Sequence, residues 1–251
     1  MPRVARKLAD GGIYHILNRG NGRQRVFHRD ADYLMFEGLL DELQERYAID
    51  LYAYCLMPNH FHLVVKACKG EALSQGMQWF TTTHVRRHHR LRRSSGHVWQ
   101  GRYKSFAIEG DTHFLTVARY VEGNPVRARL VDTAMDWVWS SHRDRVNLLT
   151  GTASGTGSKG ACPHNKRNLT TCSHGKRIET FLAPLPVSFD EDWTEFVNTP
   201  LTAKELGQVK KRVDRQTKDR SRDGDWTGTG SESACPHDPA VKRTGSVGAI
   251  L

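Results

Sequence analysis

The stretch IDLYAYCLMPNHFHLVVK, residues 49–66, decides the fold because it joins two strand patterns by a turn signal. Residues 49–57 are rich in aromatic and aliphatic side chains, and Pro58-Asn59 is typical of a turn. Residues 60–66 form a second strand pattern. The stretch therefore predicts an antiparallel β-hairpin.

Strand and helix patterns alternate on both sides of this hairpin. The expected strands cover residues 13–18, 49–57, 60–66 and 98–108, and the expected helices cover residues 30–47, 71–93 and 111–123. The order β-α-β-β-α-β-α is the split βαβ pattern of a ferredoxin-like sandwich. We therefore expect an α+β fold, an antiparallel sheet with helices on one face and the other face free for a ligand. Pro125 is expected to end the last of these helices.

The composition changes after about residue 147. The segment TGTASGTGSKG, residues 150–160, is almost entirely Gly, Ser and Thr, and GTGSKGACPH at 155–164 recurs as GTGSESACPH at 228–237. We expect four parts: an ordered domain at 1–147, a low-complexity linker at 148–180, an accessory helix and basic tail at 181–226, and a poorly ordered, repeat-containing tail at 227–251. Three Cys-x-His triplets in these parts leave zinc binding open, against the simpler interpretation of a translated repeat that the protein tolerates.

The charge balance favours an anionic partner. The chain has 37 Lys and Arg against 27 Asp and Glu, a net charge of +10. Between residues 81 and 104 there are no acids and seven basic residues, Arg86, Arg87, Arg90, Arg92, Arg93, Arg102 and Lys104. Such a block can be a solvated helix face, but with interleaved histidines it favours contacts with nucleic-acid phosphates.

Membrane and secreted proteins fit this sequence poorly. No apolar run approaches the roughly 18 residues that a membrane-spanning helix needs. The N-terminal residues MPRVARKLADGG lack the apolar core of a signal peptide. We therefore expect a cytoplasmic protein with no membrane contact.

Two groups of residues could carry chemistry. His60 and His62 lie on the second strand of the hairpin, where alternation turns both imidazoles to one face and Phe61 to the other. Tyr120 and Asn124 are four residues apart on one face of a predicted helix. A metal on the histidines could polarise a phosphate oxygen, with the Asn124 amide as a further ligand and Tyr120 as a nucleophile. From spacing alone, the simpler interpretation of two surface histidines, a core tyrosine and a helix-ending asparagine stays open and is the one that spacing favours.

Three ordered motifs go beyond spacing. MPNHFHLVV (57–65), WQGRYKSF (99–106) and ARYVEGNPVRARLV (118–131) resemble the REP-associated tyrosine transposases of the HUH single-strand transposase superfamily. The resemblance covers about residues 12–145. It implies a metal-dependent tyrosine transposase, a DNA endonuclease and strand transferase, whose catalytic domain lies within residues 1–147.

The resemblance also implies roles for the residues. His60, His62 and Asn124 match the metal ligands, with Mg²⁺ or Mn²⁺ as the family's usual ion, and Tyr120 matches the nucleophile that forms a 5′-phosphotyrosine. The partner would be single-stranded DNA with hairpin-forming palindromes, and the role DNA transposition or repeat dissemination. The arginines and Lys104 would contact DNA, and Tyr103 and Phe106 could stack on bases, although Phe106 fits the core better. A catalytically silent hairpin-binding regulator is the alternative, and a monomer or a homodimer remains open.

Overall fold

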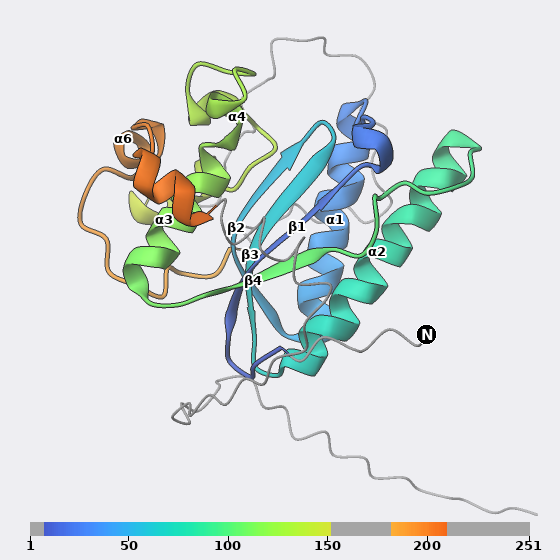
Figure 1. The fold of residues 1–251 in the computed structure, drawn as a ribbon, viewed down its shortest axis with the longest axis horizontal. Coiled ribbons are helices and arrows are strands. Elements are labelled where there is room, and N and C mark those ends of the chain that lie inside the picture. Colours follow the sequence, from blue (N-terminus) through green and yellow to red (C-terminus); the bar gives the residue numbers. More distant parts are fainter. Residues whose placement is uncertain (1–7, 152–181, 210–251) are drawn as a thin grey trace, which may run out of the picture.

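The computed structural model of the chain describes residues 8–151 and 182–209 (Figure 1). The strands are β1 (Ile13–Arg19), β2 (Ile49–Met57), β3 (His60–Ala67) and β4 (Lys104–Ile108). The helices are α1 (Asp30–Tyr47), α2 (Gly70–Arg92), α3 (Asp111–Glu122), α4 (Asn124–Arg127), α5 (His142–Leu149) and α6 (Trp193–Asn198), with 3-10 turns η1 (Asn21–Arg23) and η2 (Ala134–Asp136). Residues 203–209 are also helical.

The four strands form one antiparallel sheet in the order β2-β3-β1-β4. This is the strand order of a ferredoxin-like sandwich, so the α+β prediction is confirmed. The predicted hairpin is present as well, because β2 and β3 pair on either side of residues 58–59. On the other side of β3 lies β1, with Leu17 opposite His62 and Arg19 opposite His60.

Helices α1 and α2 cover one face of the sheet (Figure 1). Phe61 and Leu63 of β3 are fully buried on this face, against Phe36 of α1 and Phe80 of α2. The ring centroids of Phe36 and Phe61 are 5.1 Å apart, and those of Phe36 and Phe80 are 4.8 Å apart. Burying one such side chain stabilises a fold by about 1.5–3 kcal/mol. This apolar face therefore holds β3 in place.

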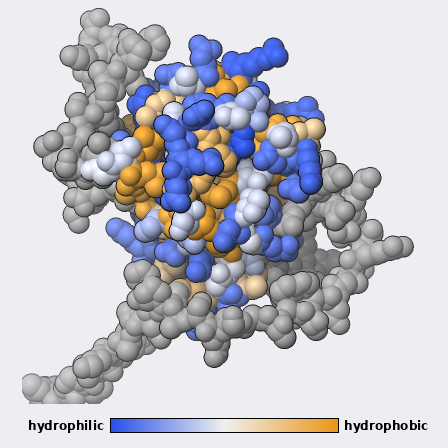
Figure 2. Space-filling model, turned by 90° about the vertical axis from the view of Figure 1, so that its left-hand side faces the viewer, coloured by the Kyte–Doolittle hydropathy of each residue, from blue (hydrophilic) through white to orange (hydrophobic). Residues whose placement is uncertain are grey.

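The face of the sheet opposite α1 and α2 is partly covered by helices. This corrects the expectation that helices cover one face only and leave the other free. Cys55 of β2 and Val64 of β3 pack there with Val117 and Val121 of α3, and Trp193 of α6 joins the same cluster. Figure 1 shows α3, α4 and α6 together on the side of the sheet opposite α1 and α2. Figure 2 shows that side of the molecule, where apolar patches lie between hydrophilic side chains. The apolar stripe of α3 needs a partner, and this face of the sheet supplies it.

A buried carboxylate fixes α3 to its neighbours. Glu122 at the end of α3 is fully buried and accepts hydrogen bonds from the Ser141 hydroxyl at 2.6 Å and from the Trp193 indole at 2.7 Å. The His142 Nδ1 at the start of α5 lies 3.1 Å from Glu122 Oε2, the oxygen that also accepts from Trp193. Buried polar groups are stable when they are paired in this way. The network sets the position of the helix that carries Tyr120.

Strand β4 is shorter than predicted. It begins at Lys104 rather than at residue 98. The preceding loop bonds to the chain that follows β1 instead: the Asn21 N–H donates to Val98 O at 2.9 Å and the Gln100 N–H donates to Arg19 O at 2.8 Å. These bonds draw the 97–101 loop toward the His60 end of β3.

Helix α3 ends at Glu122, close to the predicted end at residue 123, but a short second helix, α4, follows it. The Gly123 N–H bonds to Arg119 O and the Arg127 N–H bonds to Gly123 O, so α4 continues almost directly from α3. Pro125 lies in the first turn of α4, where a missing N–H costs little. Asn124 therefore keeps its place one turn beyond Tyr120.

Several expectations fall outside the described residues. They are those for most of the 148–180 linker, for 210–226, for the 227–251 tail and for the three Cys-x-His triplets. Residues 182–209 are described and pack beside β2 and α3, with an isolated bridge between Leu51 and Leu182. Within residues 8–151 and 182–209, no helix is long and apolar enough to cross a membrane.

Candidate active site

Three imidazoles meet on the α3 side of the sheet. His60 and His62 of β3 have ring centroids 5.1 Å apart, and His15 of β1 stacks on His62 at 5.1 Å with an interplanar angle of 22°. His15 and His62 are almost fully buried, with 2% and 4% of their surface exposed, whereas His60 is half-buried. The expected alternation is present, since Phe61 faces the opposite core. The site is therefore closed around His62 and open at His60.

Hydrogen bonds hold each of the two β3 rings through Nδ1. The His62 Nδ1 lies 2.9 Å from the His15 Nε2, and the His60 Nδ1 lies 2.6 Å from the Asn59 amide oxygen. Burial lowers the pKa of His15 to about 3 and that of His62 well below its usual value. Burial and the neighbouring Arg19 lower the pKa of His60 to about 4. At neutral pH the three rings are uncharged, which is the form that binds metal ions.

Tyr120 of α3 faces this histidine cluster from the helix that packs over it. Its ring centroid lies 5.8 Å from that of His62 and 6.1 Å from that of His15, edge-on in both cases. The Arg127 guanidinium lies 4.2 Å above the Tyr120 ring and donates a hydrogen bond to the Tyr120 carbonyl. The cation therefore packs on the face of the Tyr120 ring.

Asn124 begins α4 and is buried, with 9% of its surface exposed. Its amide nitrogen is buried and has no hydrogen-bond partner among the described residues. Two imidazoles and an amide are softer ligands than those of a typical Mg²⁺ site, so Mn²⁺ is a candidate ion beside Mg²⁺. Across residues 8–151 and 182–209, His, Cys, Asp and Glu form no group of three or more that could hold a metal.

The predicted DNA-contacting residues divide into two groups. Arg86, Arg90, Arg93 and Arg102 are exposed, and Lys104 is half-buried on β4 opposite Leu17. Arg87 and Arg92 are half-buried and form ion pairs with α1 instead, to Glu42 at 2.8 Å and to Asp32 at 2.5 Å. Their charges are matched within the protein. The exposed group is thus the part of the block that is available to phosphates.

The aromatic residues expected to stack on bases are covered. Tyr103 is 8% exposed and packs in the α1–α2 core, and Phe106 is 7% exposed with its ring 6.0 Å from that of His15. The preference for Phe106 as a packing residue agrees with this position. Neither ring offers a free face for a base.

Sequence reasoning missed three residues of the site, namely His15, Arg19 and Arg127. Arg19 is exposed and lies opposite His60 in the β1–β3 register. The sequence offered a signal for Arg127, which lies within the quoted ARYVEGNPVRARLV motif. His15 and Arg19 lie in none of the three motifs, and their place at the site depends on strand pairing.

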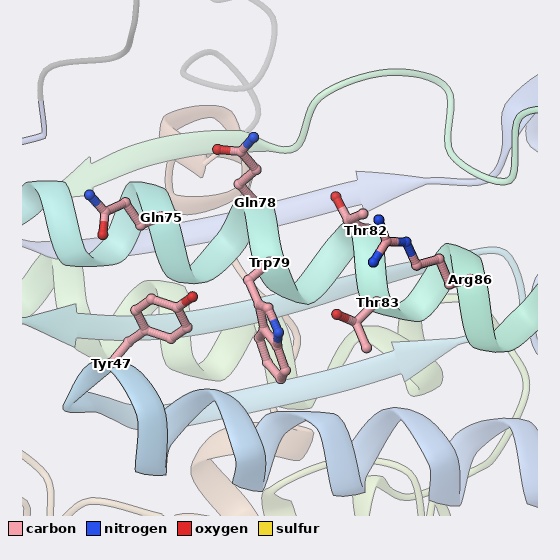
Figure 3. A pocket seen from close by; sticks show the side chains of 7 residues that line it. All are labelled: Tyr47, Gln75, Gln78, Trp79, Thr82, Thr83 and Arg86. Carbon is pink, nitrogen blue, oxygen red and sulfur yellow. The ribbon is translucent and has the colours of Figure 1, made fainter. Parts of the chain in front are cut away.

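A groove of about 390 Å³ lies elsewhere, between the end of α1 and the outer side of α2 (Figure 3). Tyr47, Trp79 and Arg86 are among the residues that line it. Tyr47 and Trp79 pack against the core on the α1–α2 side of the sheet. The sheet therefore separates this groove from Tyr120.

Comparison with known proteins agrees with the geometry. Residues 10–124 match the family model described as "Transposase IS200 like". Over 157 residues, 57% of this chain and 88% of the relative, the sequence is 25% identical to a Haemophilus influenzae protein described as a REP-associated tyrosine transposase. A solved structure described as a REP-associated tyrosine transposase bound to a REP hairpin shares the fold, with a TM-score of 0.50, 20% identity and coverage of 72% of this chain and 100% of its own. The resemblance found in the motifs is confirmed, since residues 10–124 match the IS200-like transposase model and the curated relative carries the same description.

Proposed function

We propose that this protein is an HUH-type tyrosine transposase that cuts and transfers single-stranded DNA beside hairpin-forming palindromes, in DNA transposition or repeat dissemination. The observation that carries the proposal is the approach of Tyr120 from α3 to the His60–His62 pair on β3, with ring centroids 5.8 Å apart for Tyr120 and His62. A protein that only binds DNA has no need of a tyrosine aimed at a pair of neutral imidazoles. The solved structure that shares this fold is bound to a REP hairpin, which supports a DNA hairpin as the partner of this chain.

Tyr120 would act as the nucleophile. Its phenolic oxygen attacks the scissile phosphorus and loses its proton, while the bond from phosphorus to the 3′-oxygen breaks and that oxygen gains a proton. The products are a 5′-phosphotyrosine and a free 3′-hydroxyl, so the phosphodiester energy is kept for strand transfer. The Arg127 guanidinium over the ring would add positive charge beside the phosphate.

His60, His62 and Asn124 would hold Mg²⁺ or Mn²⁺. When bound, such an ion neutralises charge that develops on a phosphate oxygen. The half-buried His60 leaves the site accessible at the end of β3, where exposed Arg19 and Arg102 lie on adjoining segments. These cations would guide the DNA backbone to Tyr120.

The exposed arginines of α2 would contact the hairpin stem. Arg86 and Arg90 are four residues apart on one face of the helix, and Arg93 is the residue that caps its C-terminus. Phosphate contacts of this kind position a duplex without reading its sequence. A cytoplasmic location and the choice between monomer and homodimer stay predictions.

The test uses a single-stranded oligonucleotide that carries a hairpin from the flanks of the gene, labelled on the strand 3′ of the expected cut. With Mn²⁺ or Mg²⁺, we expect label to migrate with the protein on a denaturing gel, and no such adduct in EDTA. Tyr120→Phe should abolish the adduct, a loss of roughly 10⁴-fold or more for a missing nucleophile, while hairpin affinity stays within about threefold. The matched control is Tyr47→Phe, which removes a hydroxyl on the far side of the sheet.

Each outcome decides between the candidates. Hairpin binding without an adduct under any metal would favour the catalytically silent regulator. Cleavage that survives Tyr120→Phe would overturn the assignment of the nucleophile.

A further inference from the structure

The two histidines of the site are each held at Nδ1, by different partners. Resting on the function proposed above, we propose that Asn59 and His15 are positioning residues that keep the proton of His60 and of His62 on Nδ1. Both Nε2 lone pairs are then available to one divalent ion. A neutral imidazole carries its proton on one nitrogen only, so the partner of Nδ1 decides what Nε2 can bind.

The case of Asn59 follows from donor and acceptor chemistry. The Asn59 amide nitrogen donates to Arg23 O at 3.1 Å, and a carbonyl can only accept. This bond turns the amide oxygen toward His60, whose Nδ1 lies 2.6 Å away. The amide oxygen accepts, so the His60 Nδ1 must carry the proton. The Asn59 backbone is held too, because the Gly20 N–H donates to Asn59 O at 2.8 Å.

The case of His15 follows from its burial and its neighbours. The 2.9 Å contact between the His15 Nε2 and the His62 Nδ1 contains one proton, since a hydrogen bond between two ring nitrogens needs one donor and one acceptor. If His62 is the donor, its Nε2 is an acceptor and can bind a metal ion. If His15 were the donor, the His62 Nε2 would carry a proton and could not bind a metal ion. We assign the proton to the His62 Nδ1, with His15 as the acceptor.

The placement of His15 is rigid. The β1–β3 ladder fixes its Cα opposite Val64, diagonal to His62, and both rings are almost fully buried and stacked. Partners of this kind set the tautomer and orientation of metal-binding histidines, and their loss typically lowers metal affinity by roughly 10–100-fold. Without such partners, a neutral histidine in water favours the proton on Nε2, which would block both ligand atoms.

The first experiment measures the tautomers without any metal. Two-bond ¹H–¹⁵N correlation spectra of the full chain in EDTA distinguish protonated from bare ring nitrogens. Cross-peaks of His60 and His62 are assigned by their loss in His60→Gln and His62→Gln. We expect both rings to carry the proton on Nδ1. A proton on Nε2 of either ring in the wild-type protein would overturn the assignment for that ring.

The second experiment compares matched variants. His15→Phe keeps a flat ring but removes the acceptor, whereas His15→Gln keeps an amide oxygen that can accept from the His62 Nδ1. Asn59→Leu and Asn59→Asp form the same kind of pair for His60. Mn²⁺ affinity, followed by electron paramagnetic resonance of the free ion, should fall by roughly 10–100-fold in the Phe and Leu variants. The Gln and Asp variants should recover most of that loss, which a merely structural role would not predict.

These results separate the inference from the function on which it rests. If the wild-type protein binds no Mn²⁺ and forms no adduct, the proposed function fails, while the metal-free spectra still decide the tautomers. If the protein binds Mn²⁺ and cleaves DNA, but His15→Phe and Asn59→Leu match the wild type in both affinity and tautomer, the inference fails and the function stands. If thermal melting shows that the Phe or Leu variant has lost its fold, the metal-free spectra of the wild-type protein alone decide the inference.

Discussion

The two faces of β3 differ although they come from the same eight residues. Toward α1 and α2, Phe61 and Leu63 are fully buried in an apolar core that is rich in aromatic rings. Toward α3, His60 and His62 lie beside Tyr120, and each ring is hydrogen-bonded through Nδ1. The face toward α1 and α2 contributes stability, and the face toward α3 carries the histidines that we propose as metal ligands. The comparison teaches that the two histidines are positioned by the apolar residue between them.

Exchanging side chains on the two faces should therefore give opposite effects, and here we expect the largest change. Phe61→Ala removes a fully buried ring and should cost about 3–5 kcal/mol of the free energy of unfolding. His60→Gln alters a half-buried polar residue and should cost less than about 1.5 kcal/mol, while abolishing Mn²⁺ binding and the DNA adduct. Urea unfolding and the adduct gel measure the two effects.

The control for this pair is Leu63→Val, which removes one buried methylene group on the apolar face. It should cost about 1 kcal/mol of the free energy of unfolding and leave DNA cleavage intact. A large loss of stability in His60→Gln with normal cleavage would contradict the division of roles between the faces.

The polar face of β3 could be predicted because strand alternation acts over two residues. The hairpin, its turn and the opposite directions of His62 and Phe61 all follow from a local pattern. His15 could not be found in this way. It lies far from His62 in sequence, and the contact depends on the β1–β3 register, which places Leu17 rather than His15 opposite His62.

Two other features were decided by tertiary packing. The stripe of α3 indicates that one side of the helix is buried, but not that it covers the second face of the sheet. The arginines at residues 86–93 lie in a stretch of sequence without acids, yet Arg87 and Arg92 pair with acids on α1. Those acids, Glu42 and Asp32, lie outside the basic stretch. Counting charges within the stretch therefore overestimates the number of arginines that are free to contact phosphates.

A histidine on the apolar face sharpens the comparison. His84 of α2 is 1% exposed, its ring lies 5.1 Å from that of Phe36, and neither ring nitrogen has a hydrogen-bond partner among the described residues. Burial lowers its pKa to about 3, and neighbouring His88 adds to the effect. The unfolded chain gains a proton here near pH 6.5 while the folded chain does not, so stability falls as the pH decreases from about 6.5 toward 3.

Replacing the His84 ring should remove its contribution to the loss of stability at acid pH. We expect this to be the second largest of the predicted effects. Between pH 7.5 and pH 5, His84→Phe should lose about 2 kcal/mol less unfolding free energy than the wild type. Urea titrations at the two pH values provide the measurement. His97→Phe, at an exposed loop position, is the matched control and should follow the wild type. Equal acid sensitivity in His84→Phe and the wild type would show that this ring is protonated in the folded protein.

The smallest expected effect per substituted residue is on the salt dependence of hairpin binding by the arginines of α2. Here the comparison is between arginines that are exposed and arginines that pair with α1. Each phosphate contact on duplex DNA contributes about −0.9 to the slope of log K against log salt. Replacing Arg86, Arg90 and Arg93 together by Ala should therefore reduce the magnitude of the slope by about 2–3 for hairpin binding. Arg87→Ala should leave the slope unchanged and cost at most about 1 kcal/mol of stability, because its guanidinium pairs with Glu42 at 2.8 Å. Fluorescence anisotropy between 50 and 200 mM salt measures both variants. Equal slope changes for each arginine, Arg87 included, would mean that the ion pairs open on DNA and that the whole block contacts the stem.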